Sequence, residues 1–156
     1  MAEGTSIPRQ RAKTPPASSQ AARAIMRANH GRDTGPELAL RRILHAQGLR
    51  YRVDYPLPFD RRRRADVAFT RARVAVFVDG CFWHGCPIHG TTPRTNTDFW
   101  ADKIARNRAR DDDTTSRLHA AGWSVLRFWE HEEPHHAAGC VARAVARALA
   151  LSAECP

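Results

Sequence analysis

The sequence predicts a single α/β domain, with a mixed central sheet flanked by helices. Its length of 156 residues is typical of one domain with one core. Short apolar segments of strand length alternate with longer, charged segments of helical length. The predicted order of the domain core is a helix, three strands, a helix, a strand and a final helix, which is typical of this class.

The first residues have a different composition. Residues 1–19 mix Gly, Ser, Thr, Pro and basic side chains without hydrophobic periodicity. Such a segment buries too little apolar surface to offset the entropy of ordering the chain. We therefore expect a disordered basic arm over residues 1–19 and the folded domain over residues 20–156.

Periodicity and capping residues predict the individual elements. Helices are expected over Gln20–Asn29, Gly35–Leu44, Asp98–Ala120 and Val141–Leu151. Strands are expected over Tyr51–Val53, Ala65–Phe69, Val74–Val78 and Trp123–Trp129. The first three strands form a meander whose first connection is a basic, proline-containing loop. Thr34 caps the second helix, Gly48 ends it, and Gly122 ends the third.

Charge and cysteine content limit the function and the compartment. The chain has 25 Lys and Arg against 16 Asp and Glu, with a pI near 10.6, which favours a polyanionic partner. We find no apolar run of membrane-spanning length and no signal-peptide core, so we expect a cytoplasmic protein. In that compartment the cysteines are expected to be metal ligands or free thiols; they are Cys81, Cys86, Cys140 and Cys155.

A compact cysteine and histidine motif predicts a zinc site. Cys81, Cys86 and His89 supply three nitrogen or sulfur ligands within nine residues, and a structural zinc takes four. His131 is the best candidate for the fourth, because it follows the strand that can end beside Val74–Val78. Cys140 is the competing candidate. The alternative is two unrelated buried thiols and a surface histidine.

Carboxylates near the same strand ends predict a second metal site. Asp66 lies on the second strand and Asp79 ends the third, so a hairpin brings them close together. Glu37 on the first core helix is a third candidate. Such carboxylates bind Mg²⁺ in a geometry suited to phosphodiester hydrolysis, and His84 has the pKa of a general base. Taken singly, Asp66 and Glu37 are also compatible with solvated surface acids.

Consecutive aromatic residues lie next to basic ones. Phe82 and Trp83 are in the polar loop, while Phe99 and Trp100 open a basic helix that continues with Lys103. In a basic protein, such rings can stack on or wedge between bases. A place in the core is the other interpretation, and it is equally good for Phe99 and Trp100.

Five ordered segments together carry a family resemblance. They are Thr34-Gly35-Pro36-Glu37, Arg64-Ala65-Asp66, Val76 to Cys86, Thr95 to Asn107 and Gly122 to Glu130. These segments closely resemble those of the very-short-patch-repair (Vsr) DNA mismatch endonucleases. The likeness extends from about Ala22 to Leu149.

The resemblance implies a restriction-endonuclease-like fold of the PD-(D/E)xK type and an Mg²⁺-dependent nicking activity. The expected nick lies 5′ to the thymine of a T:G mismatch, the product of 5-methylcytosine deamination, and initiates very short patch repair. The implied partner is duplex DNA with this mismatch, with mismatch-repair proteins as further candidates. A monomer is expected.

Site residues follow by position in the motifs. The resemblance makes Asp66 the principal Mg²⁺ ligand, His84 the general base and Glu37 an acid near the scissile phosphate. It implies a structural zinc on Cys81, Cys86, His89 and His131. It implies DNA contacts by Met26, Phe82, Trp83, Trp100, Lys103 and Asn107.

The chain departs from the best-known member of the family at Val78 and Asp79, where that member has threonine and histidine. The resemblance then implies that the main-chain carbonyl of Val78 ligates Mg²⁺, while Asp79 places a carboxylate where an imidazole is expected. Two other functions remain open. One is a restriction-type or homing-type nuclease that cuts both strands. The other is a non-catalytic, zinc-stabilised DNA-binding module.

Overall fold

The computed structural model describes residues 32–91 and 93–153, together with Gln20. Its elements are α2 (Gly35–Ala46), β1 (Arg52–Leu57), β2 (Asp60–Phe69), β3 (Val74–Asp79), α3 (Thr97–Ala120), β4 (Ser124–Trp129) and α4 (Pro134–Ala153). The predicted order of elements is confirmed. The predicted arm, Met26 and all but the first residue of the predicted Gln20–Asn29 helix lie outside the described residues.

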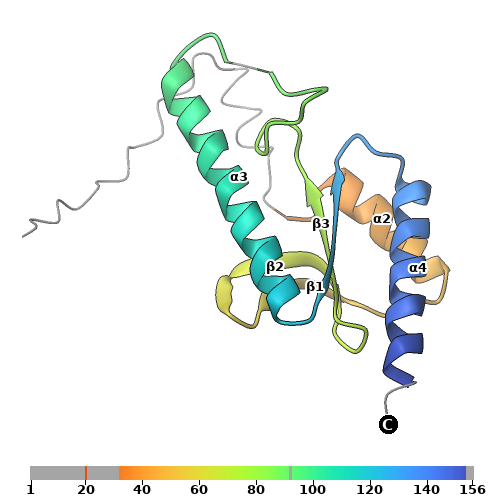
Figure 1. The fold of residues 1–156 in the computed structure, drawn as a ribbon. Helices are drawn as coiled ribbons and strands as arrows, with labels where there is room; N and C mark the ends of the chain where they lie inside the picture. The colour runs from red at the N-terminus through yellow and green to blue at the C-terminus, as the bar shows by residue number, and fades with distance from the viewer. Residues whose placement is uncertain (1–19, 21–31, 92, 154–156) are drawn as a thin grey trace, which may run out of the picture.

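The four strands form one sheet in the order β1-β2-β3-β4 (Figure 1). Successive pairs β1·β2 and β2·β3 are antiparallel, whereas β3 and β4 are parallel. A parallel pair needs a long crossover connection, and α3 supplies it. The sheet is therefore mixed, and the predicted meander of the first three strands is confirmed.

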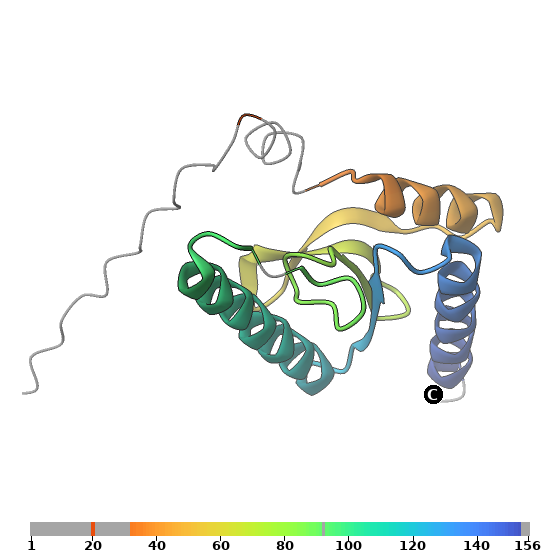
Figure 2. The same ribbon diagram turned by 90° about the horizontal axis from the view of Figure 1, so that it is seen from above.

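Helices cover both faces of this sheet (Figure 2). On one face, α2 and α4 pack over a core that includes Leu44, Val76 and Val141. On the other face lies α3, whose Leu118 packs with Ala75 and the rest of a second cluster. None of the described helices combines the length and apolarity needed to cross a membrane.

The hairpin of β1 and β2 is longer than predicted. The expected basic loop is strand, because Tyr55 pairs with Ala65 and Pro56 with Arg64. Pro56 is tolerated there because β1 is an edge strand, where a missing N–H does not interrupt a ladder. Pairing between the two strands therefore outweighs the proline and the repeated arginines, which locally favour a loop.

The last helix also begins earlier, at Pro134 rather than Val141. The side chain of Glu133 accepts hydrogen bonds from the backbone N–H groups of His135 (2.9 Å) and His136 (2.6 Å). Proline at the first helical position adds a favourable φ angle. This cap, rather than an apolar stripe, sets the start of α4.

The pairing between β2 and β3 is short. It covers only residues 67–69 of β2 and does not include Asp66. It comprises Val67↔Val76, Ala68↔Ala75 and Phe69↔Val74. Beyond these pairs β2 continues alongside β1 alone, as far as Asp60. The two strands thus diverge at Asp66, and no strand in the described part of the chain pairs with Val78 on that side.

Candidate active site

An open cleft of about 670 Å³ lies where β2 and β3 diverge. Its wall brings together the predicted catalytic residues Glu37, Asp66, Asp79 and His84. Arginines also line it: Arg62, Arg63, Arg64, Arg110 and Arg127. A cleft that combines a small acidic group with many guanidinium groups suits a phosphate backbone that must be both held and hydrolysed.

Asp66 is the most perturbed acid in the cleft. Its Oδ2 accepts a hydrogen bond from the backbone N–H of Val78 at 2.7 Å, and no described residue donates a hydrogen bond to Oδ1, which is therefore the oxygen available to a cation. Burial raises the pKa of Asp66 to about 7, against the opposing effect of that hydrogen bond. A half-buried carboxylate that lines an acidic cleft offers the kind of oxygen ligand that hard cations such as Mg²⁺ prefer.

His84 is oriented by an acid that was not among the predicted site residues. Its Nδ1 lies 2.5 Å from Oδ2 of Asp111 and 3.7 Å from Oδ1 of Asp79. Burial lowers the pKa of His84, but the bond to Asp111 and the charges of both acids raise it by more, so the net shift is upward. With Nδ1 held, Nε2 is the nitrogen available to take a proton.

A signal for Asp111 was present in the sequence. Asn107, Asp111 and Thr114 follow at helical spacing and share one face of α3, which also carries the buried Leu118. An acid on the buried side of an amphipathic helix is uncommon and indicates a partner. The Asp111-Asp112-Asp113 run concealed this, because a run of like charges is usually solvated.

Glu37 is buried at the start of α2, and its carboxylate is fully engaged. Oε2 accepts from the backbone N–H of Asp33 at 2.9 Å, and Oε1 accepts from the hydroxyl of Thr34 at 2.9 Å. Arg41 lies 3.4 Å from Oε2. Thr34 is the N-cap, as predicted, but its side chain bonds to Glu37 instead of a backbone N–H. These contacts fix the first turn of α2 against the cleft.

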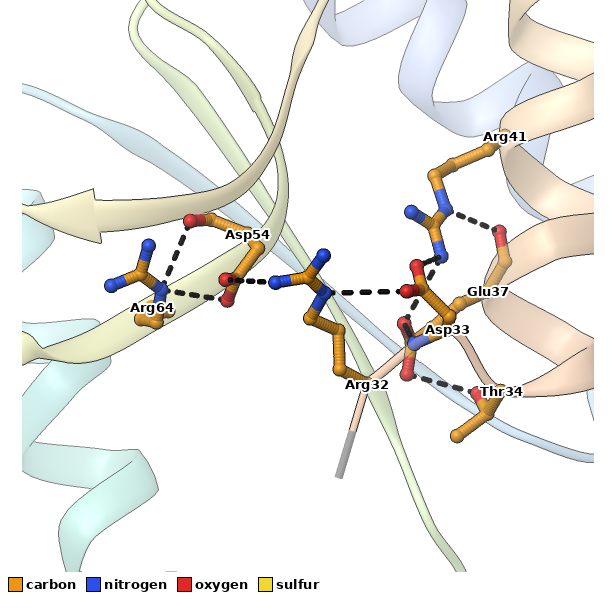
Figure 3. A network of polar contacts seen from close by, with 7 residues as sticks. All are labelled: Arg32, Asp33, Thr34, Glu37, Arg41, Asp54 and Arg64. Atoms are coloured by element: carbon orange, nitrogen blue, oxygen red, sulfur yellow. Dashed lines mark hydrogen bonds and ion pairs between the residues drawn. The ribbon is translucent and has the colours of Figure 1, made fainter. Parts of the chain in front are cut away.

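The same residues begin a chain of ion pairs that connects α2 to the hairpin (Figure 3). The successive pairs are Arg41–Asp33 (2.6 Å), Asp33–Arg32 (3.2 Å), Arg32–Asp54 (3.2 Å) and Asp54–Arg64 (2.7 Å). Arg64 lies two residues before Asp66 on β2. The chain of pairs therefore links two elements that line the cleft.

Asp79 is bound by an arginine rather than left open beside Asp66. Arg127 on β4 donates from Nε and Nη2 to the two carboxylate oxygens of Asp79, both at 2.7 Å. The hairpin does place Asp66 and Asp79 in one cleft, as expected. Arg127 was not predicted, although a lone charge within the apolar run Ser124–Trp129 was a signal for it.

The four predicted zinc ligands converge at one edge of the sheet. Since β3 and β4 are parallel, the loop after Asp79 and the turn after Trp129 lie side by side. Ligand atoms of Cys81, Cys86, His89 and His131 all lie within 4.8 Å of one another.

Two distances within this group lie close to those between the ligand atoms of a zinc site. Sγ of Cys81 is 3.1 Å from Nδ1 of His131, and Sγ of Cys86 is 3.9 Å from it. Tetrahedral zinc places its ligand atoms roughly 3.3–3.8 Å apart, so one of these distances is slightly shorter and the other slightly longer than zinc requires. Cys140, the competing fourth ligand, is not a member of the group and lies on α4, 3.7 Å from His136.

Aromatic rings form a cluster beside the cleft. Phe82 and Trp83 are half-buried and pack on Trp100, with ring centroids 5.5 and 6.0 Å away. Trp100 is only 6% exposed, so it supports the other two rings. Lys103 lies 5.0 Å from the Trp83 ring, and Asn107 donates to the carbonyl of Trp83 at 2.8 Å. Two residues expected to contact DNA, Lys103 and Asn107, thus contact the loop in this structure.

Known proteins share this sequence pattern. A family model described as "DNA mismatch endonuclease Vsr" matches residues 17–89. The type II nicking enzyme V.NaeI of Lentzea aerocolonigenes is 48% identical over 118 residues, which cover 74% of this chain and 71% of the relative. The type II nicking enzyme V.NmeDIP of Neisseria meningitidis serogroup C is 43% identical over 109 residues, covering 69% and 72%.

The DNA mismatch endonuclease Vsr of Escherichia coli K12 is 43% identical over 108 residues, which cover 67% of this chain and 66% of that enzyme. These matches agree with the expectation drawn from the motifs around Asp66 and His84, which the fold brings into one cleft. With its mixed sheet, its acidic cleft and these relatives, the chain belongs to the Vsr family of DNA mismatch endonucleases.

Proposed function

We propose that this protein nicks duplex DNA 5′ to the thymine of a T:G mismatch that arises from 5-methylcytosine deamination, and so initiates very short patch repair. The observation that carries the proposal is the juxtaposition of Asp66 and the His84–Asp111 pair in an arginine-lined cleft beside the aromatic cluster. The relatives, a mismatch endonuclease and a nicking enzyme, support the same reaction class.

The chemistry follows from the positions of the side chains. Mg²⁺ held by Asp66 and the main-chain carbonyl of Val78 would offset the negative charge that develops on the phosphate. His84 accepts a proton at Nε2 from the attacking water, while Asp111 holds Nδ1. Arg62 and Arg110, which line the cleft, bind the phosphates that flank the cut.

A structural zinc on Cys81, Cys86, His89 and His131 completes the proposal. Two of its ligands, Cys81 and Cys86, bracket the segment that carries Phe82, Trp83 and His84. Four nitrogen and sulfur atoms within 4.8 Å of one another support this assignment. Zinc would therefore hold in place both the aromatic rings of Phe82 and Trp83 and the general base His84.

Mismatch recognition is proposed to depend on Phe82 and Trp83 acting as a wedge, supported from below by Trp100. Unstacking a base step costs a few kcal/mol, and the cost is least where pairing is already weak. We expect Trp83→Ala to reduce the preference for T:G over T:A duplex about 10-fold or more, since stacking contributes about 1–3 kcal/mol per base. Competition binding with the two duplexes measures this ratio.

The matched control for the wedge is Trp123→Ala. Trp123 is also half-buried, but it packs on Tyr55, 5.9 Å away, in the hydrophobic cluster under α3. This variant should keep the mismatch preference. If Trp83→Ala weakens binding to both duplexes equally, Trp83 has only a structural role.

Strand outcome separates the three candidate functions. A supercoiled plasmid with one T:G site is incubated with the protein and Mg²⁺, then resolved on an agarose gel. The mismatch nickase converts it to the open circular form, with the nick mapping 5′ to the thymine. Linear product would instead support a double-strand nuclease, and a shifted but uncut plasmid would support a binding module.

A further inference from the structure

The cleft contains a second acidic group besides Asp66, and a side chain fills it. Ligand atoms of Asp79, His84 and Asp111 lie within 4.8 Å of one another, a spacing that suits a metal ion. The guanidinium of Arg127 binds two of the three. Its Nη2 is 2.7 Å from Oδ1 of Asp79 and 3.0 Å from Oδ1 of Asp111, and its Nε is 2.7 Å from Oδ2 of Asp79.

The position of Arg127 is determined by its contacts with the carboxylates of Asp79 and Asp111, although not all of its N–H groups find a hydrogen-bond partner. Its Nη1 is buried and has no hydrogen-bond partner among the described residues. Its guanidinium carbon is 4.6 Å from the centroid of the Phe77 ring, which supports it from one side. Burying an unpaired donor is unfavourable, so the three charge-assisted contacts to Asp79 and Asp111 must outweigh that loss.

We propose that Arg127 is the resident cation of this second acidic group, so that the cleft admits one divalent ion, at Asp66, and excludes another from Asp79, His84 and Asp111. A metal ion and the guanidinium would compete for the same carboxylate oxygens and would repel each other at that distance. The inference rests on the proposed function in one respect, the assignment of Asp66 as the ligand of the admitted ion.

Arg127 is also a positioning residue under this proposal. Asp111 uses one oxygen for Arg127 and the other for Nδ1 of His84. The guanidinium of Arg127 therefore positions Asp111, which in turn positions His84. A metal ion at this place would instead draw His84 into its own ligand shell and occupy the nitrogen that Asp111 now fixes.

Counting bound Mn²⁺, a spectroscopic substitute for Mg²⁺, tests the inference. The full chain is titrated with Mn²⁺, and the unbound ion is quantified by electron paramagnetic resonance. We expect about one ion per wild-type chain and about two per Arg127→Met chain, because removal of the guanidinium leaves two carboxylates and an imidazole free to ligate. Methionine keeps the packing over Phe77. Arg127→Lys retains a cation and should bind about one ion, like the wild type.

Two further variants assign the ions. In Arg127→Met combined with Asp111→Asn the count should return to about one, since the added ion loses a carboxylate. In Asp66→Asn alone it should fall to about zero. Retained binding in Asp66→Asn would refute the ligand role of Asp66 in the proposed function, while the difference between the methionine and lysine variants would still decide the role of Arg127.

Two results would overturn the inference. One is a count of two ions in the wild-type cleft, a measurement that does not depend on whether any variant folds. The other is a count of one in Arg127→Met whose circular dichroism and melting curve show a folded protein. If that variant does not fold, Arg127→Gln, which keeps a polar head group without the charge, replaces it under the same criteria.

Discussion

Asp66→Asn is expected to lower the nicking rate by about 10³-fold or more, because it removes the charge that would hold Mg²⁺ at the scissile phosphate. Asparagine keeps the shape of the side chain, and its carbonyl can still accept the hydrogen bond from the N–H of Val78. Single-turnover nicking of a labelled T:G duplex measures the loss. Affinity for the same duplex, measured without metal, should change little, and near-normal nicking would rule out Asp66 as the ligand.

The same substitution should stabilise the metal-free protein in a pH-dependent way. Burial raises the pKa of Asp66 to about 7 in the folded state, against 3.8 for the free side chain. Between these pH values the unfolded chain has released a proton that the folded chain retains, so stability falls as pH rises from about 4 to 7. Asparagine does not ionise, so the stability of the Asp66→Asn variant should not fall in this way as the pH rises.

Urea unfolding in the presence of chelator measures the gain. We expect Asp66→Asn to raise the free energy of unfolding by about 2–4 kcal/mol at pH 8 and by much less at pH 4.5, since one pKa unit corresponds to about 1.4 kcal/mol. Asp112→Asn, an exposed acid on α3, is the control and should show no such difference. An equal gain at both pH values would show that the effect is not ionisation.

Cys86→Ser is expected to have the largest effect on stability. The wild-type chain should contain one zinc ion by elemental analysis, and the variant should contain none after dialysis. Because zinc binding contributes directly to folding, the melting temperature should fall by about 10 °C or more, where about 1 kcal/mol corresponds to 2–4 °C for a domain of this size.

Cys140→Ser provides the matched control for the zinc site. It makes the same chemical change at a thiol on α4, outside the group formed by Cys81, Cys86, His89 and His131. This variant should keep its zinc and nearly all of its stability. Zinc loss in Cys140→Ser, or a wild-type protein without zinc, would contradict the assigned ligand set.

The sheet could be predicted where apolar periodicity and pairing agree. Val74–Val78 is apolar throughout and lies at the centre of the sheet, so its sequence and its burial coincide. The hairpin was underestimated, because Arg61–Arg64 has no apolar alternation, and β2 is extended across it by the pairing of Arg64 and Asp60 with β1. Such tertiary pairing is not encoded in a local window of sequence.

The candidate site could be predicted from spacing where its residues are close in sequence, and from the family resemblance at Glu37, Asp66 and His131. The zinc motif and His84 lie between Cys81 and His89, so their spacing carried the information. Asp111 and Arg127 come from α3 and β4, and their roles depend on how these elements pack around Asp79. The role of a single acid in a helix, or of a single arginine in a strand, can be assigned only when the fold shows which residue it contacts.

The early divergence of β2 from β3 makes the tip of the hairpin separable from the carboxylate of Asp66. Three residue pairs, all on the far side of Asp66 from the hairpin tip, fix the register of β2 against β3. The tip itself follows a shift in register between Pro56 and Leu57. A tip transplanted from a relative, or lengthened by insertion, would therefore leave the bond between Asp66 and Val78 in place. Laboratory evolution can therefore treat the tip of the hairpin as an exchangeable module, provided that the arginines of β2 that line the cleft, Arg62, Arg63 and Arg64, are kept.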